Sequence, residues 1–117
     1  MLILMIFIIT QTIKKMQTDK QVLTADATTS IIVADKRVHE SAVVQYSCRR
    51  GASAQAGKLT ITNKVTSVDV DTQYTGDDIG LTFSGSFSGN NILLDAALDS
   101  SANDVHFNYI LTKINVS

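Results

Sequence analysis

An alternation of apolar and polar residues with a period of two is the feature that most constrains this chain. It is clearest in residues 80–88 (GLTFSGSFS), where Leu81, Phe83, Gly85 and Phe87 alternate with threonine and serine. A period of two places the two sets on opposite faces of a β-strand. A strand with one apolar and one hydroxyl-bearing face is typical of an antiparallel sheet with one solvated side. An all-β fold is therefore expected.

The same alternation recurs from Val22 onward and is interrupted by clusters of Gly, Asn, Asp and Ser. Gly89 and the two asparagines that follow it suit a tight hairpin. Seven or eight such strands predict an antiparallel β-sandwich, jelly-roll-like, with the last strand in a central position. The strands expected from the pattern span residues 29–34, 42–49, 57–63, 65–74, 80–88, 92–98 and 105–115.

Composition and charge support this class and argue against others. Val, Ile and Thr make up 35 of the 117 residues, and the acidic residues are ten Asp and one Glu, which favours strands and turns over a helical bundle. The length suits one domain. A net charge of −1 does not favour a nucleic-acid partner. The single cysteine excludes an internal disulfide framework and a zinc site with several thiolates, and we expect no cofactor.

The N-terminal segment differs from the rest of the chain. Residues 1–9 (MLILMIFII) are all apolar, yet the run is shorter than the ~20 residues of a transmembrane helix. Lys14 and Lys15 follow the run instead of preceding it, which is the wrong order for a secretory signal. Three interpretations remain: translation begins at Met16, the segment is a short anchor or docking strand, or it is a degenerate signal. We therefore divide the chain into an apolar N-terminal extension, 1–16, and a β-sandwich domain, 17–117.

From Ser30 to the C-terminus, the order and spacing of several short motifs resemble a small β-sandwich domain of tailed-phage virion proteins, found in tail fibres and at particle surfaces. The resemblance implies a structural or attachment role on the virion, usually as a trimer or larger symmetric oligomer together with other virion proteins. It implies no catalytic residues. The motifs that carry it are Val44 with Tyr46, Arg50 with Gly51, residues 57–61, 73–75, 78–83 and 88–90, Ile92 with Leu94, and Phe107, Tyr109 and Leu111.

Five residues are candidates for contact with a host-surface glycan. Tyr74, followed by Thr75 and Gly76, is a plausible aromatic platform for a sugar ring, and Asp77 and Asp78 supply hydrogen-bonding groups beside it. Arg49 and Arg50 could bind a carboxylate or a phosphate-bearing sugar. Solubility, or an ion pair at an interface, is the simpler interpretation of the two arginines.

Two further sets of residues were weighed for chemistry. Cys48 needs a nearby base to act as a nucleophile, but the alternation puts Cys48 toward the core and His106 toward solvent, so we expect a buried structural thiol and no catalytic residue. Asp69 and Asp71 share a strand face and could take part in a calcium site with the aspartates at 77 and 78. A charged solvent face that prevents edge-to-edge association is the simpler interpretation, and no metal site is expected.

The sequence thus leads to a primary hypothesis and an alternative. The primary hypothesis is a non-enzymatic phage virion protein, a tail, fibre or particle-surface β-sandwich that assembles into a symmetric oligomer and contributes to host attachment. The alternative is a carbohydrate-binding β-sandwich module.

Overall fold

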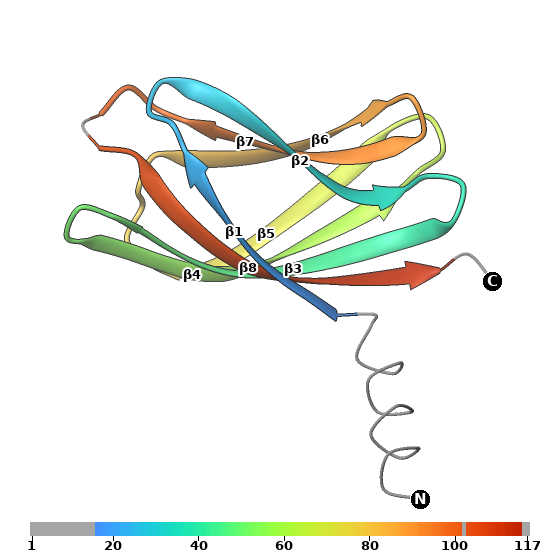
Figure 1. The fold of residues 1–117 in the computed structure, drawn as a ribbon, viewed down its shortest axis with the longest axis horizontal. Helices are drawn as coiled ribbons and strands as arrows, with labels where there is room; N and C mark the ends of the chain where they lie inside the picture. Colours follow the sequence, from blue (N-terminus) through green and yellow to red (C-terminus); the bar gives the residue numbers. More distant parts are fainter. Residues whose placement is uncertain (1–15, 102, 116–117) are drawn as a thin grey trace, which may run out of the picture.

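The computed structural model of the chain describes residues 16–101 and 103–115, with side chains from residue 19 onward (Figure 1). The predicted apolar extension therefore lies outside the described residues, apart from Met16. Among the described residues, no helix is long and apolar enough to cross a membrane. Eight strands are formed: β1 (Met16–Leu23), β2 (Ala27–Asp35), β3 (His39–Arg50), β4 (Ser53–Asn63), β5 (Val68–Gly76), β6 (Leu81–Ser88), β7 (Asn91–Leu98) and β8 (Val105–Asn115).

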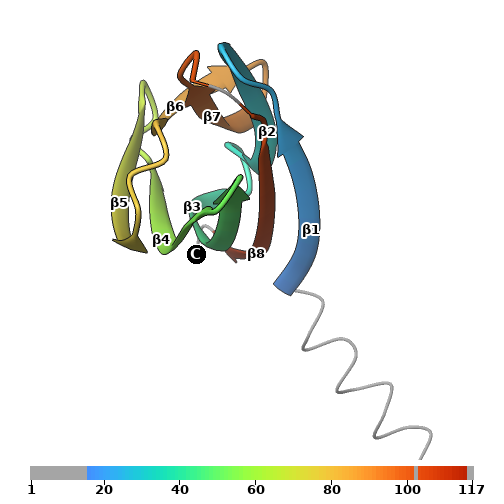
Figure 2. The same ribbon diagram turned by 90° about the vertical axis from the view of Figure 1, so that its left-hand side faces the viewer.

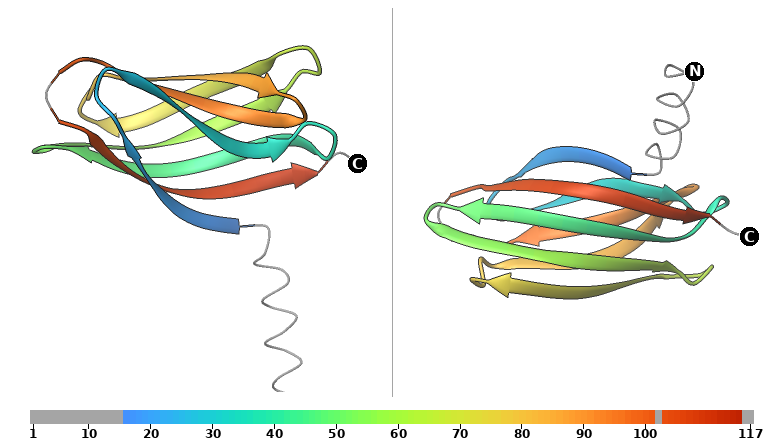
Figure 3. Two further views of the ribbon diagram at one scale, coloured as in Figure 1. Left: turned by 45° about the horizontal axis from the view of Figure 1, so that its top comes forward. Right: turned by 90° about the horizontal axis from the view of Figure 1, so that it is seen from below.

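The strands form two antiparallel sheets packed face to face (Figure 2). The larger sheet has the order β1-β8-β3-β4-β5 and the smaller one β2-β7-β6. Seen from below in Figure 3, the five strands of the larger sheet lie side by side, with β1 and β5 at its edges. The prediction of an all-β antiparallel sandwich is confirmed. The last strand is internal, as expected, because β8 pairs with both β1 and β3.

The first strand was missed by the sequence analysis. Its sequence, MQTDKQVL, contains few apolar residues and no regular alternation. The strand forms because its backbone pairs with β8 over its whole length, from Met16 opposite Thr112 to Leu23 opposite Val105. Of its residues from Asp19 onward, whose side chains the structure describes, only Leu23 at its end is fully buried. The formation of β1 therefore depends on its pairing with β8, and a local sequence pattern does not reveal such a pairing.

The core lies between the sheets and is built from the residues of one parity of each strand. In β8 these are Val105, Phe107, Tyr109 and Leu111, all buried, as the alternation predicts. Phe107 is fully buried and stacks on Tyr46 of β3 at 5.2 Å between ring centroids. Phe83 of the smaller sheet packs against both rings, at 5.3 and 5.9 Å. Offset and tilted aromatic pairs of this kind add to the stabilisation from apolar burial and here join the two layers.

The edge formed by β5 and β6 is closed by close packing over a glycine. A Cβ atom on Gly85 of β6 would collide with the side chain of Val68 and would lie 3.1 Å from Cγ2 of Val70, both on β5. The missing side chain at position 85 thus lets an edge strand of each sheet approach the other. The sequence pattern places Gly85 correctly on the apolar face but does not explain why a residue without a side chain is needed at this position.

We expect Gly85→Ala to lower the free energy of unfolding by about 1–3 kcal/mol, because the added methyl group overpacks this contact. Chemical denaturation measures the change. Ser84→Ala, at an exposed position on the same strand, is the control and should shift the free energy by less than about 0.5 kcal/mol. In a Val68→Ala background the cost of Gly85→Ala should shrink. An equal cost in both backgrounds would contradict the packing described here.

Candidate functional site

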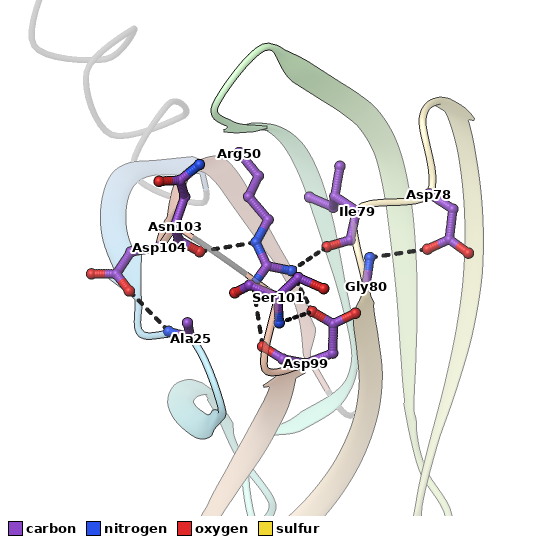
Figure 4. Close-up of polar contacts among 9 residues, drawn as sticks. All are labelled: Ala25, Arg50, Asp78, Ile79, Gly80, Asp99, Ser101, Asn103 and Asp104. Atoms are coloured by element: carbon purple, nitrogen blue, oxygen red, sulfur yellow. Dashed lines mark hydrogen bonds and ion pairs between the residues drawn. The ribbon is translucent and has the colours of Figure 1, made fainter.

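Arg50, one of the candidate glycan contacts, is a buried hub for two loops (Figure 4). Its side chain is 6% exposed. Nε donates to the carbonyl of Asn103 at 2.9 Å and Nη1 to the carbonyl of Ile79 at 2.8 Å. Nη2 donates to the carbonyls of Asp99 and Ser101 at 3.1 and 2.5 Å. The guanidinium therefore joins the end of β3 to the β5–β6 and β7–β8 loops.

In the described part of the chain, Arg50 forms an ion pair with the carboxylate of Asp99. Nη1 of Arg50 lies 2.5 Å from Oδ1 of Asp99, which also accepts the backbone N–H of Ser101 at 3.1 Å. The hydrogen bond from Arg50, followed by those from Ser101, holds the pKa of Asp99 below its usual range. All of these contacts lie within the protein, so Arg50 serves to fix the loops at this end of the sandwich.

The other acidic candidates also stabilise loops. Oδ2 of Asp77 accepts the backbone N–H of Ala54 at 3.0 Å, and Oδ1 of Asp78 accepts that of Gly80 at 3.0 Å. Both residues remain exposed. Tyr74, on the preceding strand, is 48% exposed, as expected for an aromatic platform. These three candidates thus lie at the end of β5 and in the loop that follows it.

Arg49 lies apart from this group, on the outer face of β3. Its register partner on β4 is Ala54, which in turn binds Asp77. Two strand spacings, about 10 Å, therefore separate β3 from β5 at this level. The structure places Tyr74 at the hollow over β3, β4 and β5 and Asp77 and Asp78 in the loop that follows β5. It leaves Arg49 on another strand and buries Arg50.

Cys48 and His106 face opposite sides of the larger sheet, as the sequence predicts. Cys48 is 3% exposed, and its Sγ lies 3.6 Å from the carbonyl oxygen of Gln55. Burial raises the pKa of the thiol to about 11. His106 is exposed and lies opposite Arg49 in the register. The two groups therefore do not form a nucleophile and base.

Asp69 and Asp71 occupy outward positions on β5, opposite Thr62 and Thr60 of β4. Both are exposed, as expected for a charged solvent face. In the described part of the chain, no three side chains among His, Cys, Asp and Glu gather in a way that could hold a metal ion.

The outer face of the larger sheet carries the principal hollows of the described surface. One, of about 700 Å³, lies over β1, β8 and β3, and a second, of about 400 Å³, lies over β3, β4 and β5. The two share Gln45 and Tyr46. The outward-facing lining residues come from two neighbouring cross-strand rows. The first row is Gln73, Lys58, Gln45 and Ile110; the second is Thr75, Ala56, Ser47, Asn108 and Lys20.

Between these rows lies a third row of the opposite strand parity. It consists of Tyr74, Gly57, Tyr46, Tyr109 and Asp19. Its central residues Tyr46 and Tyr109 are buried and Gly57 has no side chain, whereas Tyr74 and Asp19, on the edge strands, are exposed. Outward rows two residues apart are separated by about 7 Å along the strands. The result is a trough that runs across the strands, with the third row as its floor. We call it the transverse trough.

The walls of the transverse trough carry two cations among mostly polar side chains, with Ile110 and Ala56 as their apolar members. Lys58 stands in one wall and Lys20 in the other, and Arg49 lies in the next outward row. All three cations are exposed, and within the residues that the structure describes none of them makes an ion pair. Asp19 is the one acidic residue among the described residues that line the trough. Its carboxylate accepts the backbone N–H of Lys20 at 2.8 Å and lies 3.5 Å from the hydroxyl of Tyr109.

Comparisons with known proteins add information about the fold. No family model matches the sequence, and no curated protein matches it. Among solved structures, the tailspike protein of Acinetobacter phage vB_ApiP_P1 aligns with a TM-score of 0.53 over 85% of this chain, at 12% identity. The fold is shared with part of a phage tailspike. This chain covers 22% of the tailspike's length, so the likeness concerns one segment of a much larger protein.

A second tailspike, gp49 of Acinetobacter baumannii bacteriophage Fri1, is described as a capsular polysaccharide depolymerase. It aligns with a TM-score of 0.44 at 13% identity, over 85% of this chain and 19% of its own. The match to the first tailspike supports the fold implied by the resemblance to tailed-phage virion domains. The specific domain family stays a prediction.

Apart from Tyr74, the residues of the transverse trough were not proposed as binding residues by the sequence analysis. Gln45, Ser47 and Lys58 were recognisable as outward residues of their strands, but nothing in the sequence showed that these positions lie side by side. Only the register between β3, β4 and β8 aligns them. Lys20 could not be placed at all, because β1 was not predicted.

We expect Arg50→Gln to lower the free energy of unfolding by about 2–4 kcal/mol, because several loop carbonyls lose a charged donor. Arg50→Lys should recover only part of this loss, since an ammonium cannot reproduce the planar fork. Arg49→Gln, a neighbouring but exposed control, should change stability by less than about 0.5 kcal/mol. Equal losses in the free energy of unfolding for the variants at positions 49 and 50, measured by urea denaturation, would contradict the loop-joining role of Arg50.

The same variant should also change the dependence of stability on pH. Because the folded state lowers the pKa of Asp99, the stability gained there is present above the unfolded pKa of about 3.9 and is lost as the pH falls through the folded value. The stability difference between wild type and Arg50→Gln should therefore narrow on acidification below about pH 4. A difference that stays constant down to the folded pKa would contradict this linkage.

We expect Cys48 to resist thiol reagents in the native protein at neutral pH, since the thiol is buried and its raised pKa leaves little thiolate. Reaction with a chromogenic disulfide should be slow in buffer and fast in denaturant. Rapid, stoichiometric labelling of the native protein would reopen the possibility of thiol chemistry.

Proposed function

We propose that this chain is a non-enzymatic β-sandwich component of a phage tail, located at the particle surface. In this role it assembles into a symmetric oligomer, contacts other virion proteins and contributes to host attachment. The observation that carries the proposal is the fold shared with a segment of a phage tailspike over 85% of the chain. A fold does not by itself define a function, so the features of this chain must support the same conclusion.

Two such features favour a scaffold over an enzyme. Cys48 is buried and faces away from His106, which removes the nucleophile that the sequence offered. Arg50 and the aspartates near it bind loop backbone. The polar side chains thus rigidify one end of the sandwich, as a structural module requires.

The larger sheet also offers surfaces for assembly. Among the described residues, its outer strands β1 and β5 each pair with a strand on one side only. Unpaired strand edges are common sites of association between chains, and identical chains that associate through one repeated contact form closed rings when the rotation closes.

The alternative function, a carbohydrate-binding module, is favoured by a separate observation. The outer face of the larger sheet carries amide, hydroxyl and ammonium groups around open hollows, and these groups can bind the hydroxyls of a sugar. A tail protein that binds host glycans would combine the two functions.

We expect the full 117-residue chain to form a trimer or a larger symmetric oligomer. Size-exclusion chromatography with multi-angle light scattering gives the mass. A monomer at micromolar to millimolar concentrations would contradict the self-assembling role. Mass that grows without limit as the concentration rises would instead indicate open-ended association through an exposed edge, which also contradicts a symmetric tail component.

A further inference from the structure

We propose that the transverse trough binds an extended anionic polysaccharide, one whose sugars carry carboxylates. The inference rests on the proposed contact with the host surface and identifies where that contact is made and what chemistry it selects. It also moves the binding site away from Asp77 and Asp78, toward the outer face of the larger sheet.

The shape of the trough suits a linear chain that crosses the strands. Its floor is the third row, of the opposite parity, and its walls are the two outward rows about 7 Å apart. Five strands span about 19 Å at the usual spacing, which accommodates several consecutive sugar units. The small residues Gly57, Ala56 and Ser47 lie near its middle, so no bulky side chain interrupts it there.

Its charge selects an anion. Lys20 and Lys58 stand in opposite walls, in different strands, and Arg49 lies one row beyond. Widely spaced cations match a polymer that carries a carboxylate on some of its sugars. The two carboxylates on the outer face of β5, Asp69 and Asp71, lie outside the two wall rows. The chain as a whole has a charge of −1, so the cations of this face are not part of a generally basic surface.

The neutral groups favour a polysaccharide over a nucleic acid. Gln45, Gln73 and Asn108 are exposed, and among the described residues none of their side-chain amides makes a hydrogen bond inside the protein. Such amides can both donate to and accept from sugar hydroxyls. Nucleic-acid grooves combine dense positive charge with aromatic platforms for the bases, whereas the outward rows of the trough hold no aromatic residue.

The test is the binding of the full 117-residue chain to polygalacturonate oligomers, measured by isothermal titration calorimetry at low ionic strength. The double variant Lys20→Gln/Lys58→Gln should bind about tenfold more weakly, since each exposed ion pair contributes up to about 1 kcal/mol. The control Arg37→Gln/Lys64→Gln removes the same charge from exposed turns and should stay within about twofold of wild type.

A second pair of variants tests the trough itself. Ser47→Glu places a carboxylate in the middle of one wall and should abolish binding while both lysines remain. Thr82→Glu adds the same charge on β6, in the other sheet, and should leave binding unchanged. Circular dichroism and thermal unfolding of all four variants confirm that they fold.

Several outcomes would overturn the proposal: no binding of polygalacturonate, equal binding of neutral dextran, binding of single-stranded DNA at least as tight as that of polygalacturonate, or equal losses in the trough variants and their controls. Light scattering on the same samples separates this inference from the proposed function. An oligomer that does not bind polygalacturonate would contradict the binding role of the trough but not the structural role. A monomer that binds polygalacturonate would contradict the assembly role but not the binding role of the trough.

Discussion

The packing of Phe83 from the smaller sheet onto Tyr46 and Phe107 of the larger one is the interaction on which the rest of the structure depends. These rings lie 5.2 to 5.9 Å apart and come from three strands that are distant in sequence. They fix β3 and β8 as neighbours inside the larger sheet. The side of β8 that does not face β3 pairs with β1. This pairing forms a polar strand that no local sequence pattern predicts.

A second constraint lies at the loop end of the sandwich, where the buried side chain of Arg50 donates hydrogen bonds to several loop carbonyls. Such a buried cation is retained only if its donors are satisfied. The sequence analysis grouped Arg49 with Arg50 as possible ligand contacts because adjacent arginines look alike. Strand parity separates them, since one points into the sandwich and the other toward solvent, and only Arg49 remains on an accessible face.

The proposed functions rest on the outer face of the larger sheet, which takes no part in the core. The residues that alternate with the buried ones of β3, β4 and β8 are mostly polar and become rows on a flat outer surface. A row of the opposite parity between two outward rows leaves a shallow trough, and here its walls carry lysines and amides. A scaffold that joins other virion proteins through its strand edges and meets a host polysaccharide with this face is compatible with the fold shared with a tailspike segment.

The alternation by itself determined the all-β class, seven of the eight strands and the buried face of several of them, because a period of two in burial is visible within a single strand. It also placed Cys48 inside and His106 outside. The order of the strands, the existence of β1, the approach of β5 to β6 over Gly85 and the alignment of Lys20, Ser47 and Lys58 were decided only by the tertiary structure. These features depend on which strand pairs with which and in what register, and pairings between residues far apart in the chain leave no periodic signal in the sequence.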